Sequence, residues 1–154
     1  MELSADTCER VTQSWDRLTA MKRYEETAGE LIFERIFEMD PSSCKQFNFR
    51  ENENLRTSDH FVTQAKRVVG MLECIVDILG PDLDHFTKAL AMLGKRHNSF
   101  GLHESQIYMM EKAAIYALEE LLDDEFSRSD RRAWQTVFYF VARHMKENRD
   151  EIIE

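Results

Sequence analysis

Apolar residues recur at helical spacing along almost the whole chain, and very few residues interrupt them. The 154 residues include only five glycines and two prolines, which are the residues that most often mark turns and strand ends. The alternation of apolar and polar residues that would indicate β-strands is nearly absent. We therefore predict an all-α fold and one domain over residues 1–154, a length that suffices to bury a real core.

The breaks in this pattern predict where the helices begin and end. Ser4 or Asp6 can cap the first helix, and Asp40 with Pro41 suits the start of a short turn after the second. Ser127 and Asp130 resemble a capping box before the last helix. Residues 48–58 are polar and irregular. We expect helices over about 4–21, 25–39, 59–79, 84–97, 105–122 and from 127 onward.

Charge and cysteine content narrow the function classes. A formal net charge of -9 argues against binding to nucleic acid or to an anionic membrane. No run of 18 apolar residues predicts a membrane span, and the N-terminus lacks the pattern of a signal peptide, so we expect a cytoplasmic protein. Cys8, Cys44 and Cys74 are scattered, which suits a reducing compartment. Cys44 and Cys74 would form a redox pair only if the fold brought them together.

One histidine ends an otherwise apolar helical stripe. Phe86, Leu90, Leu93 and His97 follow one another at steps of four, three and four residues, which places them on one helix face. An imidazole in that position points into the core or at something bound there, and its neutral nitrogen is a good ligand for iron. A histidine satisfied within the core is the alternative, and the stripe by itself leaves both interpretations open.

The chain resembles the globin family over nearly its whole length. Residues 31–41 are similar to the second globin helix as it runs into the short third helix. Phe47 stands where globins place a phenylalanine against haem, and residues 61–68 resemble the distal helix. Residues 93–97 resemble the proximal histidine segment of neuroglobin-like and single-domain bacterial globins, and residues 133–134 also recur there. The resemblance implies a globin fold of about seven to eight helices around a haem pocket.

The cofactor implied by this resemblance is haem b, iron protoporphyrin IX, with His97 as the metal ligand. Phe47 is expected to stack on the porphyrin, and Val68 to sit over the iron and limit ligand size. Lys95, Arg96 and Arg67 are candidates for pairing with the propionates, and a solvated helix surface is the alternative for each. The remaining expected haem contacts are Gln64, Met71, Leu93, Leu102, Ile107 and Phe138.

Gln64 is the expected distal residue, because it lies four residues before Val68 on the same stripe. Its amide can donate a hydrogen bond to bound oxygen, and the alternative is an amide that points to solvent. Many globins carry histidine here, and an amide is a poor iron ligand. We therefore predict an open sixth position, which His60 alone among nearby histidines could fill. The resemblance also implies that Phe33 lies beside the ligand, at a position where bacterial globins often have tyrosine, so we expect moderate oxygen retention.

The resemblance implies reversible binding of O2, and of CO and NO, at ferrous iron, for oxygen storage, transport or scavenging. One alternative is redox catalysis with an external reductase, as nitric oxide dioxygenase, nitrite reductase or peroxidase-like enzyme. Another is a gas sensor that acts through a partner protein. Ile107 stands where flavohaemoglobins have a tyrosine that polarises the axial histidine, and from the length of the chain to Glu154 we expect no reductase domain. We expect a monomer or a weak homodimer.

Overall fold

The computed structural model describes residues 3–50, 54–79, 88, 92 and 104–153, and every element within these ranges is helical. The all-α prediction is therefore confirmed for this part of the chain. No helix there is long and apolar enough to cross a membrane. The elements are α1 (Ala5–Thr19), α2 (Tyr24–Met39), η1 (Pro41–Phe47), η2 (Leu55–Thr57), α3 (Phe61–Asp77), α5 (Glu104–Leu122), η3 (Asp123–Glu125) and α6 (Arg128–Ile153), where η marks a 3-10 helix.

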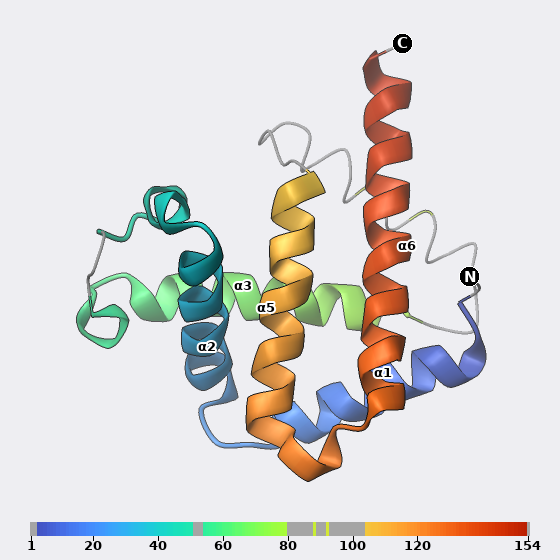
Figure 1. The fold of residues 1–154 in the computed structure, drawn as a ribbon, viewed down its shortest axis with the longest axis horizontal. Helices are drawn as coiled ribbons and strands as arrows, with labels where there is room; N and C mark the ends of the chain where they lie inside the picture. Colours follow the sequence, from blue (N-terminus) through green and yellow to red (C-terminus); the bar gives the residue numbers. More distant parts are fainter. Residues whose placement is uncertain (1–2, 51–53, 80–87, 89–91, 93–103, 154) are drawn as a thin grey trace.

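The helices pack in two crossing directions. Helices α2, α5 and α6 stand side by side, and α3 runs across α2 at a steep angle (Figure 1). Helix α1 packs against α6 at the end of the molecule where η3 joins α5 to α6. Short η1 follows α2 directly and packs back on it, and η2 contacts α3.

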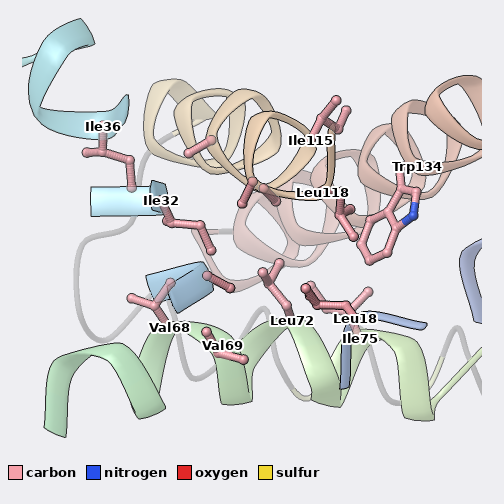
Figure 2. Close-up of a cluster of buried hydrophobic side chains, with 14 of the residues drawn as sticks. Leu18, Ile32, Ile36, Val68, Val69, Leu72, Ile75, Ile115, Leu118 and Trp134 are labelled. Atoms are coloured by element: carbon pink, nitrogen blue, oxygen red, sulfur yellow. The ribbon is translucent and has the colours of Figure 1, made fainter. Parts of the chain in front are cut away.

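The hydrophobic core lies where α3 crosses the other helices. The apolar side chains of α3 follow helical spacing, so they share one face of that helix. This face meets α1, α2 and α5 (Figure 2). Each of the labelled side chains in this cluster is at most 5% exposed, and full burial of such a side chain stabilises a fold by roughly 1.5–3 kcal/mol. The labelled residues are Leu18, Ile32, Ile36, Val68, Val69, Leu72, Ile75, Ile115, Leu118 and Trp134.

Two predicted helix starts are confirmed by their capping hydrogen bonds. The Ser4 hydroxyl accepts a hydrogen bond from the Thr7 amide at 3.1 Å, which caps α1. Asp40 caps η1, since its carboxylate accepts from the Ser42 amide at 3.2 Å, and Pro41 is the first residue of that helix. These caps satisfy amides that have no partner within their own helix.

The capping box before α6 is also confirmed. The Ser127 amide donates to the Asp130 carboxylate at 3.0 Å, and the Asp130 amide donates to the Ser127 hydroxyl at 3.1 Å. Asp130 is only 6% exposed and also lies 3.4 Å from Arg10 and 3.9 Å from Arg17. The first turn of α6 is therefore tied to α1 by charge as well as by packing.

Several expected boundaries differ from the structure by one or two residues. Helix α1 ends at Thr19, α3 begins at Phe61, and α5 begins at Glu104, so Ser105 lies inside the helix that it was expected to cap. Helix ends fray, and an apolar pattern does not record the last hydrogen bond. Within the predicted irregular range, residues 48–50 and 54–58 are described, and they are irregular as expected apart from the short η2. Of the helix predicted over 84–97, only residues 88 and 92 are described, and both are helical, while the others lie outside the described residues.

One glycine sets how closely α2 and α3 approach. A Cβ atom placed on Gly29 would lie 2.6 Å from the Cβ atom of Ala65. No side chain larger than hydrogen fits there without moving one helix, so Gly29 allows the backbones to come together at the crossing. Because Ala65 follows Gln64 directly, this contact helps to set the position of the expected distal residue.

Candidate functional site

A cavity of about 480 Å3 opens between α3, α5, α6 and η1. Most of its wall is aliphatic, aromatic or thioether side chain. The fold brings seven of the predicted haem contacts to this one cavity, although they are spread over more than ninety residues of sequence; they are Phe47, Gln64, Arg67, Val68, Met71, Ile107 and Phe138. The other four predicted contacts lie outside the described residues, as does Lys95; they are Leu93, Arg96, His97 and Leu102.

Helix α3 supplies one wall of the cavity. Gln64, Val68, Met71 and Ile75 line it at steps of four, three and four residues, so they form one stripe along the helix. Gln64 and Val68 are buried, and Met71 is half-buried. Helical spacing alone predicts this stripe. It places the Gln64 amide at one end of the wall and apolar side chains along the rest.

The Gln64 amide is held in a defined orientation. Its side chain is 7% exposed, and Nε2 donates a hydrogen bond of 3.0 Å to the backbone carbonyl of Phe47. A carbonyl oxygen only accepts, so the NH2 end of the amide faces Phe47 and one further N–H remains for another acceptor. The side chain therefore does not point to solvent, and it ties α3 to η1 at the cavity.

Phe33 lies behind the cavity wall instead of in it. This side chain is fully buried, and its ring centroid is 5.1 Å from that of Phe47 in an edge-to-face contact. Phe37 and Phe49 enclose it further, at 5.8 and 5.3 Å. Phe33 is not among the residues that line the cavity, because this aromatic cluster surrounds it. Its contact with the cavity passes through Phe47.

His60 is likewise absent from the cavity wall. Its ring stacks on Phe49 with 4.8 Å between centroids, and Nδ1 lies 3.4 Å from the Ser58 hydroxyl. The other ring nitrogen, Nε2, is buried without a hydrogen-bond partner among the described residues. His60 is the N-cap residue of α3 and does not line the cavity, although it lies only one turn before Gln64.

Polar side chains that the sequence did not single out also line the cavity. Gln106 of α5 donates a hydrogen bond of 3.1 Å to Gln46 of η1, and both residues line the cavity together with Ser43 and Asn48. These residues come together only through the packing of α5 near η1, so no local pattern marks them. Met110 and Val141 also line the cavity, and their spacing of three residues from Ile107 and Phe138 could have indicated them.

Arg67 is the one cationic side chain among the described residues of the cavity wall. It is exposed, and no described carboxylate lies within ion-pair distance of it. The cavity thus combines an apolar interior with a guanidinium at its edge. Such a site suits a largely apolar molecule that carries an acidic group.

Other candidate chemistry finds no support in the described part of the chain. Cys44 is buried in η1 and Cys74 is exposed near the end of α3, and no disulfide bond joins them. No group of three histidine, cysteine, aspartate or glutamate side chains among the described residues is arranged to hold a metal ion. Tyr108, which follows Ile107, is 58% exposed, whereas Ile107 lines the cavity.

Comparison with known proteins agrees with this arrangement. The family model named Globin matches residues 30–145. Neuroglobin of Tetraodon nigroviridis is 26% identical over 148 residues, which cover 94% of this chain and 91% of that protein. A globin of Aequiyoldia eightsii is 29% identical over 146 residues, which cover 92% and 95% of the two chains.

Two solved structures share the fold. Hemoglobin from the botfly Gasterophilus intestinalis aligns with a TM-score of 0.79 at 15% identity, over 96% of this chain and 99% of that one. A hexacoordinated heme protein from an anhydrobiotic tardigrade, determined at pH 4, aligns with a TM-score of 0.77 at 20% identity, over 96% and 95% of the two chains. Since the family model spans most of the sequence and these folds coincide with it, the chain belongs to the globin family.

Proposed function

We propose that this globin binds haem in the 480 Å3 cavity, with His97 as the axial ligand, and reversibly binds O2 and other diatomic gases there. The observation that carries the proposal is the convergence of seven predicted haem contacts on one cavity. The haem would supply a ferrous iron to which a gas molecule binds. The two solved structures with this fold are a hemoglobin and a heme protein by their titles.

The chemistry of the cavity suits haem b. Phe47 and Phe138 offer aromatic surface, and Val68, Met71 and Ile107 offer aliphatic and thioether surface to a flat apolar ring. Haem b needs no thioether bond to cysteine, and the sequence has no C-x-x-C-H motif of the kind that attaches haem covalently. The cavity therefore supplies non-covalent contacts of the required type.

Arg67 provides the polar counterpart. Its exposed guanidinium has no described carboxylate partner, so it is available to pair with a propionate at the edge of the cavity. Lys95 and Arg96 remain further candidates on sequence grounds. An ion pair at this exposed position adds about 0–1 kcal/mol to the free energy of haem binding. The pair would therefore orient the haem more than it would strengthen its binding.

The distal residues favour a gas ligand over an endogenous one. Gln64 lies in the cavity, and its second N–H can donate to bound O2, a bond worth roughly 0.5–1.5 kcal/mol. Its amide is a poor iron ligand, and the His60 ring is packed on Phe49. We therefore propose a ferrous haem with an open sixth position. Phe33 supports Phe47 from behind and adds no second donor, which fits moderate oxygen retention.

Redox catalysis remains the second candidate, with weaker support. A tyrosine that polarises the axial histidine would have to reach the haem, and Tyr108 is instead 58% exposed with the Lys112 ammonium over its ring at 5.1 Å. Because Tyr108 is exposed, we place gas binding before redox catalysis.

Absorption spectra of the purified chain mixed with hemin test the proposal. The ferric, ferrous and ferrous-CO forms should report a bound haem, and the ferrous form should lack the sharply split visible bands of a six-coordinate low-spin haem. A His97→Gly variant should lose haem uptake and regain it when free imidazole is added, because imidazole replaces the missing ligand. A His60→Ala variant serves as the matched control and should retain haem. Undiminished haem uptake by His97→Gly would refute the proposed axial ligand.

A further inference from the structure

Helix α3 starts without the local features that usually hold a helix start. Its N-cap residue, His60, makes no side-chain capping hydrogen bond, and no acidic residue lies in the first turn. The backbone turn is held by the hydrogen bonds from the Phe61 amide to the Ser58 carbonyl and from the Gln64 amide to the His60 carbonyl. The direction in which this turn points therefore depends on contacts with other elements.

Arg56 of η2 supplies one set of such contacts. Its Nε atom donates to the Glu30 carboxylate, and its Nη1 atom lies 3.6 Å from the Glu26 carboxylate, one turn earlier on α2. The same guanidinium lies over the ring of Phe61, with its central carbon 5.6 Å from the ring centroid. Arg56 thus joins two successive turns of α2 to the first residue of α3. Figure 1 shows how α2 and α3 lie relative to each other.

This contact lies within one turn of the cavity. Phe61 is 2% exposed, so its ring cannot shift without disturbing the core. Gln64 is three residues further along the same turn, and its amide meets the Phe47 carbonyl. A displacement of the first turn of α3 would therefore change where the Gln64 amide lies in the cavity.

We propose that Arg56 is a positioning residue for Gln64, and that it thereby sets the strength of the hydrogen bond to a bound gas and the rate of O2 release. This inference rests on the proposed function. The role favours arginine, because a planar guanidinium holds several N–H donors in fixed directions toward two carboxylates while its face covers a ring, whereas an ammonium is a compact point charge without that planar geometry. The Arg56, Glu26 and Glu30 side chains are 42%, 32% and 26% exposed, so salt should weaken the clamp.

Arg35 offers a matched control. Its side chain is 43% exposed, it lies 3.0 Å from the Glu38 carboxylate, and its guanidinium lies 5.3 Å from the Tyr116 ring centroid. It has the same kinds of contact as Arg56 but joins α2 to α5, away from the first turn of α3. The comparison of Arg56→Gln with Arg35→Gln therefore separates the proposed role from the general loss of an exposed arginine.

Measurements of two kinds test the inference, the first on haem-loaded protein and the second independent of haem. In haem-loaded protein, Arg56→Gln should speed O2 dissociation about threefold and shift the infrared stretching frequency of bound CO toward that of Gln64→Met, because a clamp of this strength is worth less than about 1 kcal/mol. Arg35→Gln should change neither the O2 dissociation rate nor the CO frequency. Arg56→Lys should keep part of the change in both quantities that Arg56→Gln produces. The difference between Arg56→Gln and the unchanged chain should shrink as ionic strength rises.

The second measurement does not depend on haem. Hydrogen exchange of the amides of residues 61–64 in the full chain should be faster in Arg56→Gln than in Arg35→Gln, at equal stability to urea. Equal exchange in the two variants would overturn the clamp itself. Faster exchange with unchanged O2 release and CO frequency would overturn the link to Gln64. If the chain bound no haem, the proposed function would fail, while the exchange result would still decide whether Arg56 holds α3.

Discussion

The side-chain amide of Gln64 donates a hydrogen bond of 3.0 Å to the backbone carbonyl of Phe47, and both residues line the same cavity. This bond joins α3 to η1, so the residue expected to meet a gas ligand also helps to close the structure around that ligand. The amide therefore has two acceptors to serve when a ligand is bound, one on the protein and one on the ligand.

Replacement of Gln64 by methionine should remove both interactions without a large change in volume. We expect O2 to dissociate severalfold faster, because a hydrogen bond worth roughly 0.5–1.5 kcal/mol is lost, while CO release changes less. Stopped-flow replacement of O2 by CO measures this rate. Gln135→Met, on the exposed face of α6, should leave it unchanged. Slow O2 release that survives in Gln64→Met would mean that another donor faces the ligand.

Gly29→Ala should destabilise the fold although alanine favours helices. The added Cβ atom would lie 2.6 Å from the Cβ atom of Ala65, and overpacking of this kind costs about 1–3 kcal/mol. Urea unfolding measures the loss. Gly70→Ala is the matched control on α3, where no atom lies within 4 Å of the new Cβ, and it should stabilise the protein by about 0.5–1 kcal/mol. A gain of stability in Gly29→Ala would contradict the close crossing, and adding Ala65→Gly to Gly29→Ala should recover most of the loss.

Asp130→Ala should lower stability by about 2 kcal/mol or more, since it removes the capping partner of the Ser127 amide and leaves Arg10 without its buried carboxylate. Asp124→Ala removes an exposed carboxylate in the neighbouring η3 and should change stability by less than about 0.5 kcal/mol. Thermal unfolding followed by circular dichroism distinguishes the two. Equal melting temperatures for both variants would show that the capping box contributes little.

Stability should depend on pH through Glu111, which is half-buried on α5. Burial raises the pKa of Glu111 above its ordinary value of 4.5, an effect that Lys112 partly offsets. The folded chain therefore binds this proton more tightly than the unfolded chain does, and the ionised side chain destabilises the fold at neutral pH. As pH falls through the folded pKa this destabilisation disappears, and below the unfolded pKa both states carry the proton.

Glu111→Gln should accordingly be more stable than the unchanged chain at pH 7, and the difference should vanish as pH approaches 4.5. Urea unfolding across this pH range measures both curves. Glu120→Gln, on the exposed face of the same helix, provides the control for a lost surface charge. A stability difference that stays constant with pH would mean that the effect of Glu111→Gln does not come from ionisation.

The sequence alone was sufficient for the features that depend on neighbours along one helix. Helical spacing predicted the stripe of Gln64, Val68 and Met71, and capping chemistry predicted the hydrogen bonds of Ser4 and of the Ser127–Asp130 pair. These interactions join residues two to four positions apart, so the sequence places their partners as soon as the helix is assumed. The helix boundaries were predicted less accurately, because the apolar pattern does not show where the last backbone hydrogen bond of a helix forms.

Only the tertiary structure decided which residues meet across helices. It gave the Gln64 amide the Phe47 carbonyl as partner, enclosed Phe33 behind Phe47, and turned His60 onto Phe49. It also joined Gln46 to Gln106 in the cavity wall. These contacts depend on the crossing angle and separation of helices, which follow from the packing of all their faces at once, and no short stretch of sequence contains that information.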